Sequence, residues 1–543
     1  MDFQRLFLFL IFSFSALLLW DAWQKQQHPV PLAKIEASVY APKTNIDPPK
    51  KLAITNTNEI KGITENHALS GKKIVVRTDN FLVVINTIGG DIQRVELLKH
   101  KAALDTNKPL VLLQRQVKRT YIAQTGLLGE GMPSHHALFT STANKYSLKN
   151  GADTLAVRLQ ADKSITKVIT FHRNSYLIDV SYEIKNNTKT PLTTSAYFQL
   201  VRDEGAPIGA SKLVPTYTGP AIYTDEEKFK KVKFSDIEKN KAKFPREADN
   251  GWIAILQHYF VTAWLSKEKE HREYYARNLG DKLFSVGEIL PVATIQPGNI
   301  GKVSSTLYVG PANSKLDTIA PGFGLTVDYG WLTVIATPLF WLLAHIEALV
   351  HNWGLAIIIL TFLIKLVFFP LSATSYRSMA RMRIVAPKLE KIKKQHEGDR
   401  DKLNRAMMDL YKTEKINPLG GCLPMVIQIP VFISLYWAIL SSVELRHAPF
   451  FGWISDLSAA DPYYILPALM GISMLIQSKL SPAPPDPLQA KLMRFMPVIF
   501  SVVFFFFPAG LVLYSVVNNV LSITQQWYIT RSQELGQKGV TKT

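Results

Sequence analysis

The sequence predicts a polytopic α-helical membrane protein that carries a large all-β domain. Of its 543 residues, 47% are hydrophobic, and several apolar runs are long enough to suggest membrane helices. Between two of these runs lies a stretch rich in β-branched and aromatic residues, punctuated by Gly, Asn and Pro. Cys422 is the single cysteine, which excludes an intrachain disulfide and a cysteine-based metal site. An exported domain must therefore be held together by its core alone.

The net charge of +19 does not by itself indicate a nucleic-acid-binding protein. The sequence contains no zinc-ligand spacing and no RNP-like or helix-turn-helix signature. Basic residues instead lie next to the apolar runs, as the positive-inside rule predicts for a membrane protein.

Residues 1–23 are predicted to form an uncleaved signal anchor, with the N-terminus in the cytoplasm. Trp20 and Trp23 at the end of its apolar run resemble an interfacial belt, whereas a cleaved signal would end in small residues. A cleaved signal is the alternative, because the run is short for a span. Residues 24–66 are rich in Pro, Lys, Asn and Thr and are predicted to be a linker.

Residues 67–325 are predicted to form one large antiparallel β-sandwich, because they contain many short strand patterns and no long amphipathic helix. A short helix is expected over residues 225–239. His135 and His136 are interpreted as surface histidines, since no third metal ligand is near them in the sequence. No nucleophile elbow, phosphate-binding glycine loop or spaced carboxylate pair indicates catalysis. The clearest predicted strands are residues 73–77, 81–87, 168–172, 176–184 and 304–309.

Residues 326–352 are predicted to contain an amphipathic helix that lies in the membrane interface. Its apolar stripe is interrupted by His345, Glu347 and His351, and Pro338 lies within it, so that it would make a poor span. Packing of this helix against the β-sandwich is a compatible alternative.

The remaining segments are placed by their charges. Residues 375–415 hold 12 Lys or Arg against 6 Asp or Glu, so residues 373–417 are predicted to be a cytoplasmic helical hairpin. Its basic face could contact RNA, lipid head groups or an acidic protein, or could be merely solvated. The charge pattern predicts six spans in total, with both termini in the cytoplasm. Two of the spans are short for a hydrocarbon core of about 30 Å, so the bilayer beside them should thin or the spans must lie among neighbouring helices. After the anchor, the spans are residues 353–372, 418–443, 463–478, 492–507 and 511–530, with a Pro-rich cytoplasmic loop at 479–491 and a cytoplasmic tail at 531–543.

Lys365 lies well inside the apolar run of residues 354–371, one helical turn after Thr361. A lysine at the centre of a membrane helix costs roughly 2.5 to 3.5 kcal/mol, so the presence of Lys365 in this run requires an explanation. Snorkelling of its long stem to the interface is one explanation. The other spans carry polar residues at a matching depth, which favours a water-filled recess open to the cytoplasmic leaflet. These residues are Gln428, Ser434, Ser473, Gln477, Tyr514, Ser515, Asn518, Asn519 and Gln525.

Several motifs together resemble the YidC family of membrane protein insertases, within the wider Oxa/YidC/Alb group. Mitochondrial and chloroplast relatives share only a five-helix core, so the β domain points to the Gram-negative branch. The motifs are Lys-Thr-Glu-Lys-Ile-Asn-Pro-Leu-Gly-Gly-Cys-Leu-Pro at 412–424, Gln-Ile-Pro at 428–430, Phe-Pro-Ala-Gly-Leu-Val-Leu-Tyr at 507–514, Gly-Gly-Asp-Ile at 89–92, Asp-Tyr-Gly-Trp at 328–331 and Asp-Pro-Tyr-Tyr-Ile-Leu-Pro at 461–467.

The resemblance implies an inner-membrane protein with a periplasmic β-supersandwich, a five-helix insertase core, and a hydrophilic groove open to the cytoplasm and lipid but closed outside. It also implies that the groove inserts inner-membrane proteins and helps them to fold, alone or with the Sec translocon. Implied groove residues are Lys365, Thr361, Gln428, Pro430, Tyr514, Ser515 and Asn518, and implied recruitment residues of the hairpin are Arg377, Arg381, Arg383, Lys391 and Lys394.

Two positions depart from the family pattern. The groove cation is typically an arginine, and Lys365 keeps its charge without the planar fork. Ser515 stands where close relatives often have a second tyrosine.

The resemblance suggests nascent inner-membrane proteins, Sec translocon components, ribosome–nascent chain complexes and the lipid bilayer as partners, without nucleic-acid specificity. The tail is only mildly basic, so ribosome contact would depend mainly on the hairpin. No cofactor, metal or enzymatic activity is expected. A secondary transporter that uses Lys365 as its ion or substrate site is the alternative, but it predicts paired repeats that the sequence lacks. A tethered carbohydrate-processing enzyme is a third hypothesis, against which the missing carboxylate constellation argues.

Overall fold

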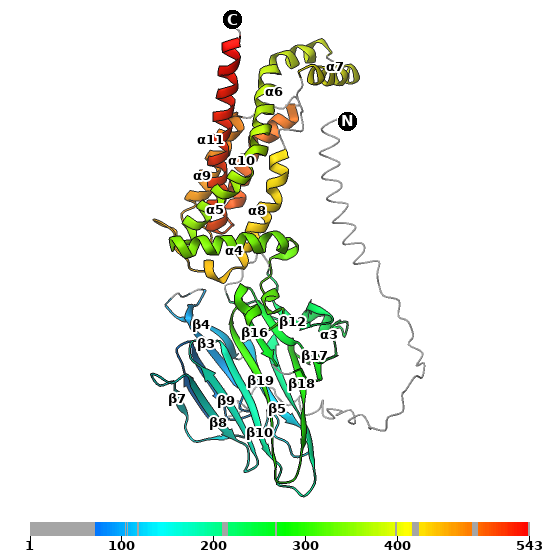
Figure 1. Ribbon diagram of the computed structural model, residues 1–543, viewed down its shortest axis with the longest axis vertical. Helices are drawn as coiled ribbons and strands as arrows, with labels where there is room; N and C mark the ends of the chain where they lie inside the picture. The colour runs from blue at the N-terminus through cyan, green and yellow to red at the C-terminus, as the bar shows by residue number, and fades with distance from the viewer. Residues whose placement is uncertain are drawn as a thin grey trace, which may run out of the picture. The chain divides into compact units, whose positions relative to one another are not determined.

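The computed structural model describes residues 71–540, except for 104, 106, 117–118, 209–215, 267–268, 397–398, 415–422 and 481–486. The predicted anchor and linker therefore lie outside the described residues, as do residues 397–398 at the turn of the hairpin and residues 481–486 of the Pro-rich loop. Strands fill the first part of the described chain and helices the second (Figure 1).

The β-rich part consists of two sheets, one of ten strands and one of nine. Their neighbouring strands pair antiparallel, except for β1 and β7, which are parallel. The first sheet has the order β14-β17-β18-β11-β5-β4-β3-β2-β1-β7. Its strands are β1 Lys73–Arg77, β2 Phe81–Asn86, β3 Ile92–Lys101, β4 Pro109–Gln116, β5 Arg119–Leu128, β7 Lys145–Ser147, β11 Leu192–Asp203, β14 Glu247–Ala248, β17 Arg272–Gly280 and β18 Leu283–Ile295.

The second sheet has the order β13-β12-β15-β16-β19-β10-β9-β8-β6. Its strands are β6 Thr140–Ser141, β8 Thr154–Gln160, β9 Ile165–His172, β10 Leu177–Lys185, β12 Gly219–Thr224, β13 Lys228–Lys231, β15 Trp252–Gln257, β16 Phe260–Leu265 and β19 Ile300–Pro311. The five strands predicted most clearly from the sequence are confirmed, as parts of β1, β2, β9, β10 and β19.

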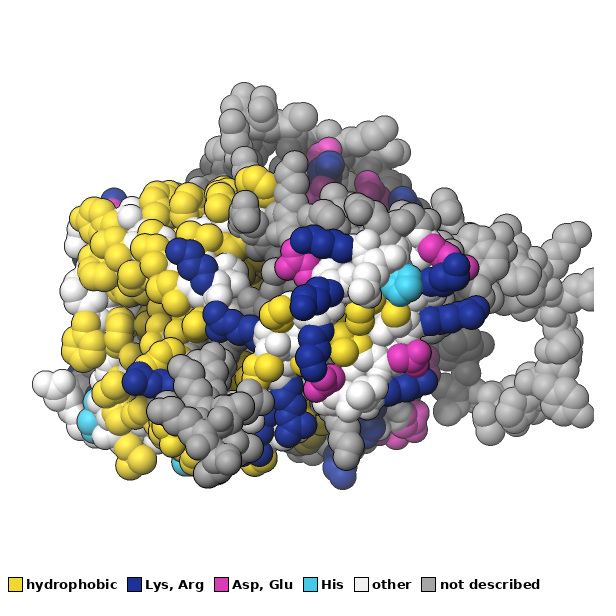
Figure 2. All heavy atoms as spheres, turned by 90° about the horizontal axis from the view of Figure 1, so that it is seen from above, with side chains coloured by type: hydrophobic (Ala, Val, Ile, Leu, Met, Phe, Trp, Pro, Cys, Tyr) yellow, Lys and Arg dark blue, Asp and Glu magenta, His cyan; other side chains and the backbone are white. Residues whose placement is uncertain are grey.

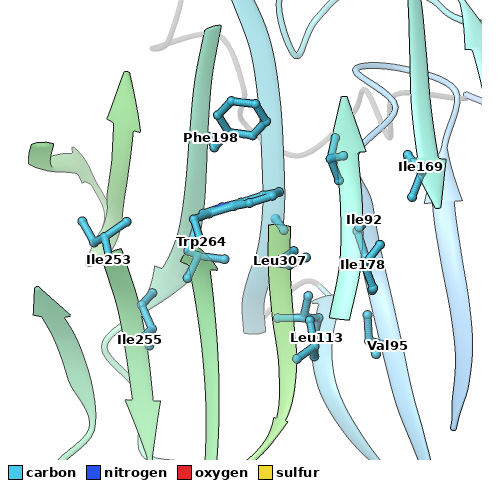
Figure 3. Packing of buried hydrophobic residues seen from close by; sticks show 14 of the residues in the cluster. Ile92, Val95, Leu113, Ile169, Ile178, Phe198, Ile253, Ile255, Trp264 and Leu307 are labelled. Atoms are coloured by element: carbon cyan, nitrogen blue, oxygen red, sulfur yellow. The ribbon is translucent and has the colours of Figure 1, made fainter. Parts of the chain in front are cut away.

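One hydrophobic cluster joins the two sheets. Along β10 every second residue is buried, because successive side chains of a strand point to opposite faces. Val95 and Phe198 from the first sheet and Ile169, Trp264 and Leu307 from the second belong to this cluster (Figure 3). Each is fully buried, and burial of apolar area at about 25 cal/mol per Å² is what holds a cysteine-free domain together.

The helix predicted over residues 225–239 is wrong in its first half. Residues Lys228–Lys231 form β13, which pairs with β12, and only Phe234–Glu238 are helical, as α3. A neighbouring strand edge satisfies the backbone of Lys228–Lys231 and overrides the local helical pattern.

The interpretation of His135 as a surface residue is only partly right, because the residue is half-buried. Its backbone N–H donates to the Tyr197 hydroxyl at 2.9 Å, and its Nδ1 lies 2.5 Å from the same oxygen. His136 is exposed, as expected. Burial lowers the pKa of His135 to about 4.

The helical part comprises eight α-helices within the described residues. A bend of 68° separates α5 from α6, because Pro370 in the first turn of α6 has no N–H with which to continue the ladder of α5. The helices are α4 Thr333–Val350, α5 Trp353–Val367, α6 Phe369–Gln395, α7 Arg400–Thr413, α8 Leu423–Ser441, α9 Ile465–Leu480, α10 Pro487–Phe504 and α11 Ala509–Val540.

The lengths of these helices do not by themselves establish six membrane spans. In the described chain, α4 alone is long and apolar enough to cross a bilayer, and the bent pair of α5 and α6 would be a second. The apolar parts of α8, α9 and α10 are shorter. However, α4 runs across the ends of the other helices (Figure 1). A helix in that direction cannot cross the same bilayer alongside them, so its interfacial placement is retained as a prediction.

The half-buried His135, whose pKa is lowered to about 4, predicts a pH dependence of stability. Below pH 6.5 the unfolded chain binds a proton at this histidine, while the folded chain does not until the pH approaches 4. The free energy of unfolding therefore falls as the pH falls through this window. In His135→Gln, urea denaturation followed by tryptophan fluorescence at pH 7, 6 and 5 should show a shallower fall than in the unaltered protein. His136→Gln, at the exposed neighbour, should show the original slope, and equal slopes in all three proteins would contradict the prediction.

Candidate functional site

A polar cluster lies where α5, α6 and α11 meet. Helix α5 begins at the Asn352 cap, whose side chain accepts a hydrogen bond from the Leu355 N–H at 2.9 Å. Its inward face is apolar except for Thr361 and Lys365, which are spaced four residues apart and are 0% and 2% exposed. The snorkelling explanation for Lys365 is therefore wrong: the side chain points into the protein.

The Lys365 ammonium is held by a neighbouring helix. Its Nζ donates to the Ser522 hydroxyl of α11 at 2.6 Å. That hydroxyl donates its own hydrogen to the Asn518 carbonyl at 2.7 Å, so it meets the lysine as an acceptor. Tyr376 of α6 lies beside Ser522. No carboxylate among the described residues forms an ion pair with Lys365, and the ammonium therefore lies buried with its charge uncompensated.

The two other hydroxyls predicted for the site bond to their own helices. Thr361 Oγ1 donates to the Ile357 carbonyl at 2.6 Å, and Ser515 Oγ donates to the Leu511 carbonyl at 2.9 Å. Both residues are buried. Their hydrogens are committed, so toward a ligand these side chains offer lone pairs and Lys365 is the donor.

Tyr514 belongs to an aromatic cluster rather than to the contacts around Lys365. Its ring centroid lies 6.3 Å from that of Phe432 on α8, and Phe432 also contacts Phe504 on α10 at 6.5 Å. Tyr514 precedes Ser522 by eight residues, which is about 12 Å along a helix. The cluster therefore fills the end of α11 that is nearer to Pro508.

That end is closed by the segment between α8 and α9. The Gly510 N–H donates to the Leu457 carbonyl at 2.9 Å, and the Ala509 N–H donates to the Ala459 carbonyl at 2.7 Å. A Cβ on Gly510 would lie 3.2 Å from the Leu457 oxygen, so a side chain there would push the loop back by a few tenths of an ångström. The Asp461 carboxylate holds the same segment, because it accepts from Trp453 Nε1 at 3.1 Å and from the Leu466 N–H at 2.7 Å.

Not every polar residue predicted to share the recess does so. Asn519 Nδ2 donates to the Ser473 hydroxyl at 3.2 Å, so this pair joins α9 to α11. Gln428 and Pro430 are partly exposed on α8, and their role beside Lys365 stays a prediction. Ser434 is 0% exposed, and its hydroxyl has no hydrogen-bond partner among the described residues.

Ser522 was missed from the sequence. A single serine in an apolar helix carries no distinctive signal, because such residues commonly bond back to their own helix. Its spacing supplied the only clue, since Ser515, Asn518 and Ser522 recur at three and four residues on one face of α11.

The hairpin helices carry an exposed basic surface. Lys388 on α6 pairs with Glu414, just beyond α7, at 2.7 Å, which fixes the two helices together. Figure 2 shows Lys and Arg side chains gathered on this end of the molecule beside a broad apolar surface. The five predicted recruitment residues are all exposed; they are Arg377, Arg381, Arg383, Lys391 and Lys394.

The apolar surface beside it lies on the helices. Large apolar side chains are exposed on all eight of these helices, as is expected where lipid is the solvent. They include Phe362 and Leu366 on α5, Val426 and Ile429 on α8, Leu469 and Ile472 on α9, and Phe495, Val498 and Ile499 on α10.

Comparison with known proteins covers almost the whole chain. The family described as "YidC periplasmic domain" matches residues 73–342, and the family described as "60Kd inner membrane protein" matches residues 345–537. A membrane protein insertase YidC from Nitrosospira multiformis is 53% identical over 98% of both chains. The same-named protein from Methylobacillus flagellatus is 52% identical over 98% of both.

A solved structure of an active YidC insertase, with its first transmembrane domain resolved, covers 84% of this chain and 95% of its own. It is 19% identical, with a TM-score of 0.40, which is too low to support an argument from the superposition. The sequence relatives and the two family matches are sufficient: the chain belongs to the YidC family of inner-membrane protein insertases.

Proposed function

We propose that this chain inserts proteins into the inner membrane through a hydrophilic recess in which Lys365 receives a polar segment of the substrate. The observation that supports this proposal most directly is the buried ammonium of Lys365, held by one serine and paired with no carboxylate of the described residues. A cation in that state attracts an acidic segment and is free to release it. An internal ion pair would have removed both properties.

The energetics require no nucleotide. Each leucine-like residue gains about 0.3 to 0.6 kcal/mol on entering the bilayer, so a span of some 20 can outweigh the transfer of one or two charges past it. The apolar part of the substrate would slide along the exposed faces of α8 and α10, where Ile429, Val498 and Ile499 already face outward. The buried Ser434 hydroxyl without a partner is a position where water is expected, which would lower the desolvation cost of the polar segment.

The proposed topology has both termini and the hairpin in the cytoplasm and the β-rich part in the periplasm. The exposed basic surface of the hairpin supports the cytoplasmic assignment of that end. The opposite end, near Gly510 and Asp461, is covered by its own loop, which supports a recess with a single opening. The predicted segment boundaries, the six spans, and cooperation with the Sec translocon and ribosome–nascent chains belong to this proposal as well.

The charge of Lys365 should be required for insertion. Lys365→Met keeps most of the side-chain volume and removes the charge, so insertion of single-span substrates with an acidic translocated tail should fall at least about tenfold, the effect of losing roughly 1.4 kcal/mol. Lys365→Arg should retain most of the activity. Protease protection of the translocated tail, in cells depleted of the native insertase, measures the effect. Lys479→Met, at an exposed lysine near the end of α9, serves as the matched control, and normal insertion by Lys365→Met would refute the role of the charge.

The Ser522 hydroxyl should position the ammonium. Ser522→Ala removes a hydrogen bond to a charged group, which is worth about 1.5 to 3 kcal/mol, and should reduce insertion of the same substrates without abolishing it. Ser478→Ala on α9 is the matched control, because its hydroxyl donates only to the Leu475 carbonyl of its own helix and no groove role is predicted for it. A uniform loss in both variants would mean that helix packing, rather than the position of Lys365, limits activity.

The basic surface of the hairpin should recruit nascent chains. Arg381→Glu combined with Arg383→Glu should weaken cosedimentation with stalled ribosome–nascent chain complexes. Raising the salt concentration should weaken the cosedimentation of the unaltered protein in the same way. Lys185→Glu combined with Lys302→Glu, on β10 and β19 and also at exposed positions, changes the net charge by the same amount and is the control. Recruitment that withstands both the double variant and high salt would exclude an electrostatic contact at the hairpin.

A further inference from the structure

A cavity of about 120 Å³ lies away from the Lys365 site, at one end of the β-rich part. Its walls come from β4, β5, the end of β11, the turn between β15 and β16, and the loop that follows α8. Three arginines from three different segments line it: Arg119, Arg202 and Arg446.

Arg202 is buried without a full set of partners. Its side chain lies over the Tyr121 ring at 4.9 Å, and its Nη2 donates to the Gly205 carbonyl at 3.3 Å. The residue is 3% exposed, yet its Nη1 has no hydrogen-bond partner among the described residues. An unsatisfied charged donor at such depth is costly, so a ligand that accepts from Nη1 would recover that cost.

The one carboxylate in the cavity is already used. Asp203 Oδ1 lies 3.0 Å from Arg119 Nη1 and accepts from the Gly205 N–H, while its Oδ2 accepts from the Thr120 N–H at 2.8 Å. Asp203 therefore neutralises Arg119 and leaves the charge of Arg202 unpaired.

Arg446 adds a second unpaired charge. Its guanidinium lies 5.6 Å from the Phe260 ring centroid and 6.0 Å from that of Tyr259. Asp456 attracts it, but within the described residues that carboxylate lies against His447 and forms no ion pair with Arg446. His258 adds no charge at neutral pH, because burial lowers its pKa to about 4. The cavity thus presents two guanidinium groups in excess of its carboxylate.

We propose that this cavity binds a phosphate ester, with Arg202 and Arg446 as its ligands. The forked guanidinium matches the oxygens of a phosphate, and two forks match a group that carries one to two negative charges. Apolar side chains line the same cavity, among them Leu110, Val111 and Ile208, which is 60% exposed. A phosphate that carries an apolar group therefore suits it better than a bare ion.

The position of the cavity makes a phospholipid headgroup one source of the ester. His258 Nε2 donates to the Leu440 carbonyl at the end of α8, at 2.7 Å, so the cavity wall is tied to a helix proposed to span the membrane. A soluble phosphate ester is the other source. This site lies apart from Lys365, and its existence does not depend on the proposed insertion mechanism.

Binding to the purified full-length protein in a non-ionic detergent would test the assignment. The probes for calorimetric titration are dihexanoyl phosphatidylglycerol, glycerol 1-phosphate, inorganic phosphate and glutarate. Arg446→Gln, at a half-buried position, and Arg202→Gln should each weaken phosphate-ester binding at least about tenfold, as expected for the loss of one charge-assisted hydrogen bond. Arg158→Gln on β8 is the matched control and should bind like the unaltered protein. If Arg202→Gln does not fold, the binding measured with Arg446→Gln alone decides whether the site binds phosphate esters.

The probes separate the sources of the ligand. Binding of phosphatidylglycerol alone, lost in Arg446→Gln, assigns a lipid headgroup, whereas equal binding of glycerol 1-phosphate assigns a soluble ester. Both outcomes support the site. Glutarate bound as tightly as the phosphate esters would overturn the assignment in favour of a carboxylate, such as that of an acidic peptide. Unchanged binding in Arg446→Gln, or no binding of any phosphate probe, would overturn the site itself. The same variants should also be assayed for insertion. Because Lys365 is intact in them, a loss of phosphate binding in these variants is independent of the proposed role of Lys365 in insertion.

Discussion

A buried ammonium with no carboxylate to neutralise it is the constraint on which the helical part depends. Removing a cation from water costs several kcal/mol, and a single hydroxyl recovers only part of that cost. Helix α11 must hold Ser522 within 2.6 Å of Lys365 Nζ, so α5 and α11 have to pack in one register. An acidic partner at the same place would have stabilised the fold more but would have occupied the cation. The helical part thus keeps a costly group available, which is a usual sign of function in a membrane.

The closed end near Gly510 supplies the asymmetry that this cation needs. The aromatic rings of Phe432, Phe504 and Tyr514 and the loop held by Asp461 fill the bundle there. Water that reached Lys365 from both ends would screen its charge and open a path for ions. A recess with one opening allows hydration of a polar segment while the apolar packing at the other end stays intact.

The sequence predicted those features that depend on short-range pattern. Alternation along a strand identified β1, β2 and β10, and the shared depth of polar residues predicted that Lys365 faces inward. Long-range pairing lay beyond such reasoning. The Asn519–Ser473 hydrogen bond joins residues far apart in the chain, so Asn519 was assigned to the recess when it joins two helices. Ser522 looked like any serine of an apolar helix until the fold brought it to Lys365.

The two corrections in the β-rich part have different causes. Lys228–Lys231 has a charge pattern that suits a helix, but the edge of β12 offers it a ladder of hydrogen bonds, and local propensity yields to such a partner. The partner of Lys228–Lys231 is local, since β12 and β13 are joined by residues 225–227, and it was missed because the charge pattern suited a helix. His135 is half-buried against Tyr197, which lies on a strand much later in the chain. The partner of His135 could not be found without the sheet order, which places β11 beside β5 and β18.

In the proposed mechanism, short helices and the recess both lower the free-energy cost of moving a charged segment across the hydrocarbon core. Helix α9 has 16 residues, which rise about 24 Å, less than the roughly 30 Å of an average hydrocarbon core. If α9 spans the bilayer as proposed, the lipid beside it should thin, because exposing apolar side chains such as Leu469 and Ile472 to water would cost more than compressing the bilayer by a few ångströms. A thinner core would shorten the path of a charged segment, and the proposed recess at Lys365 would shorten it further from the cytoplasmic side. The two effects together reduce the desolvated distance, which is why one modest cation can be sufficient.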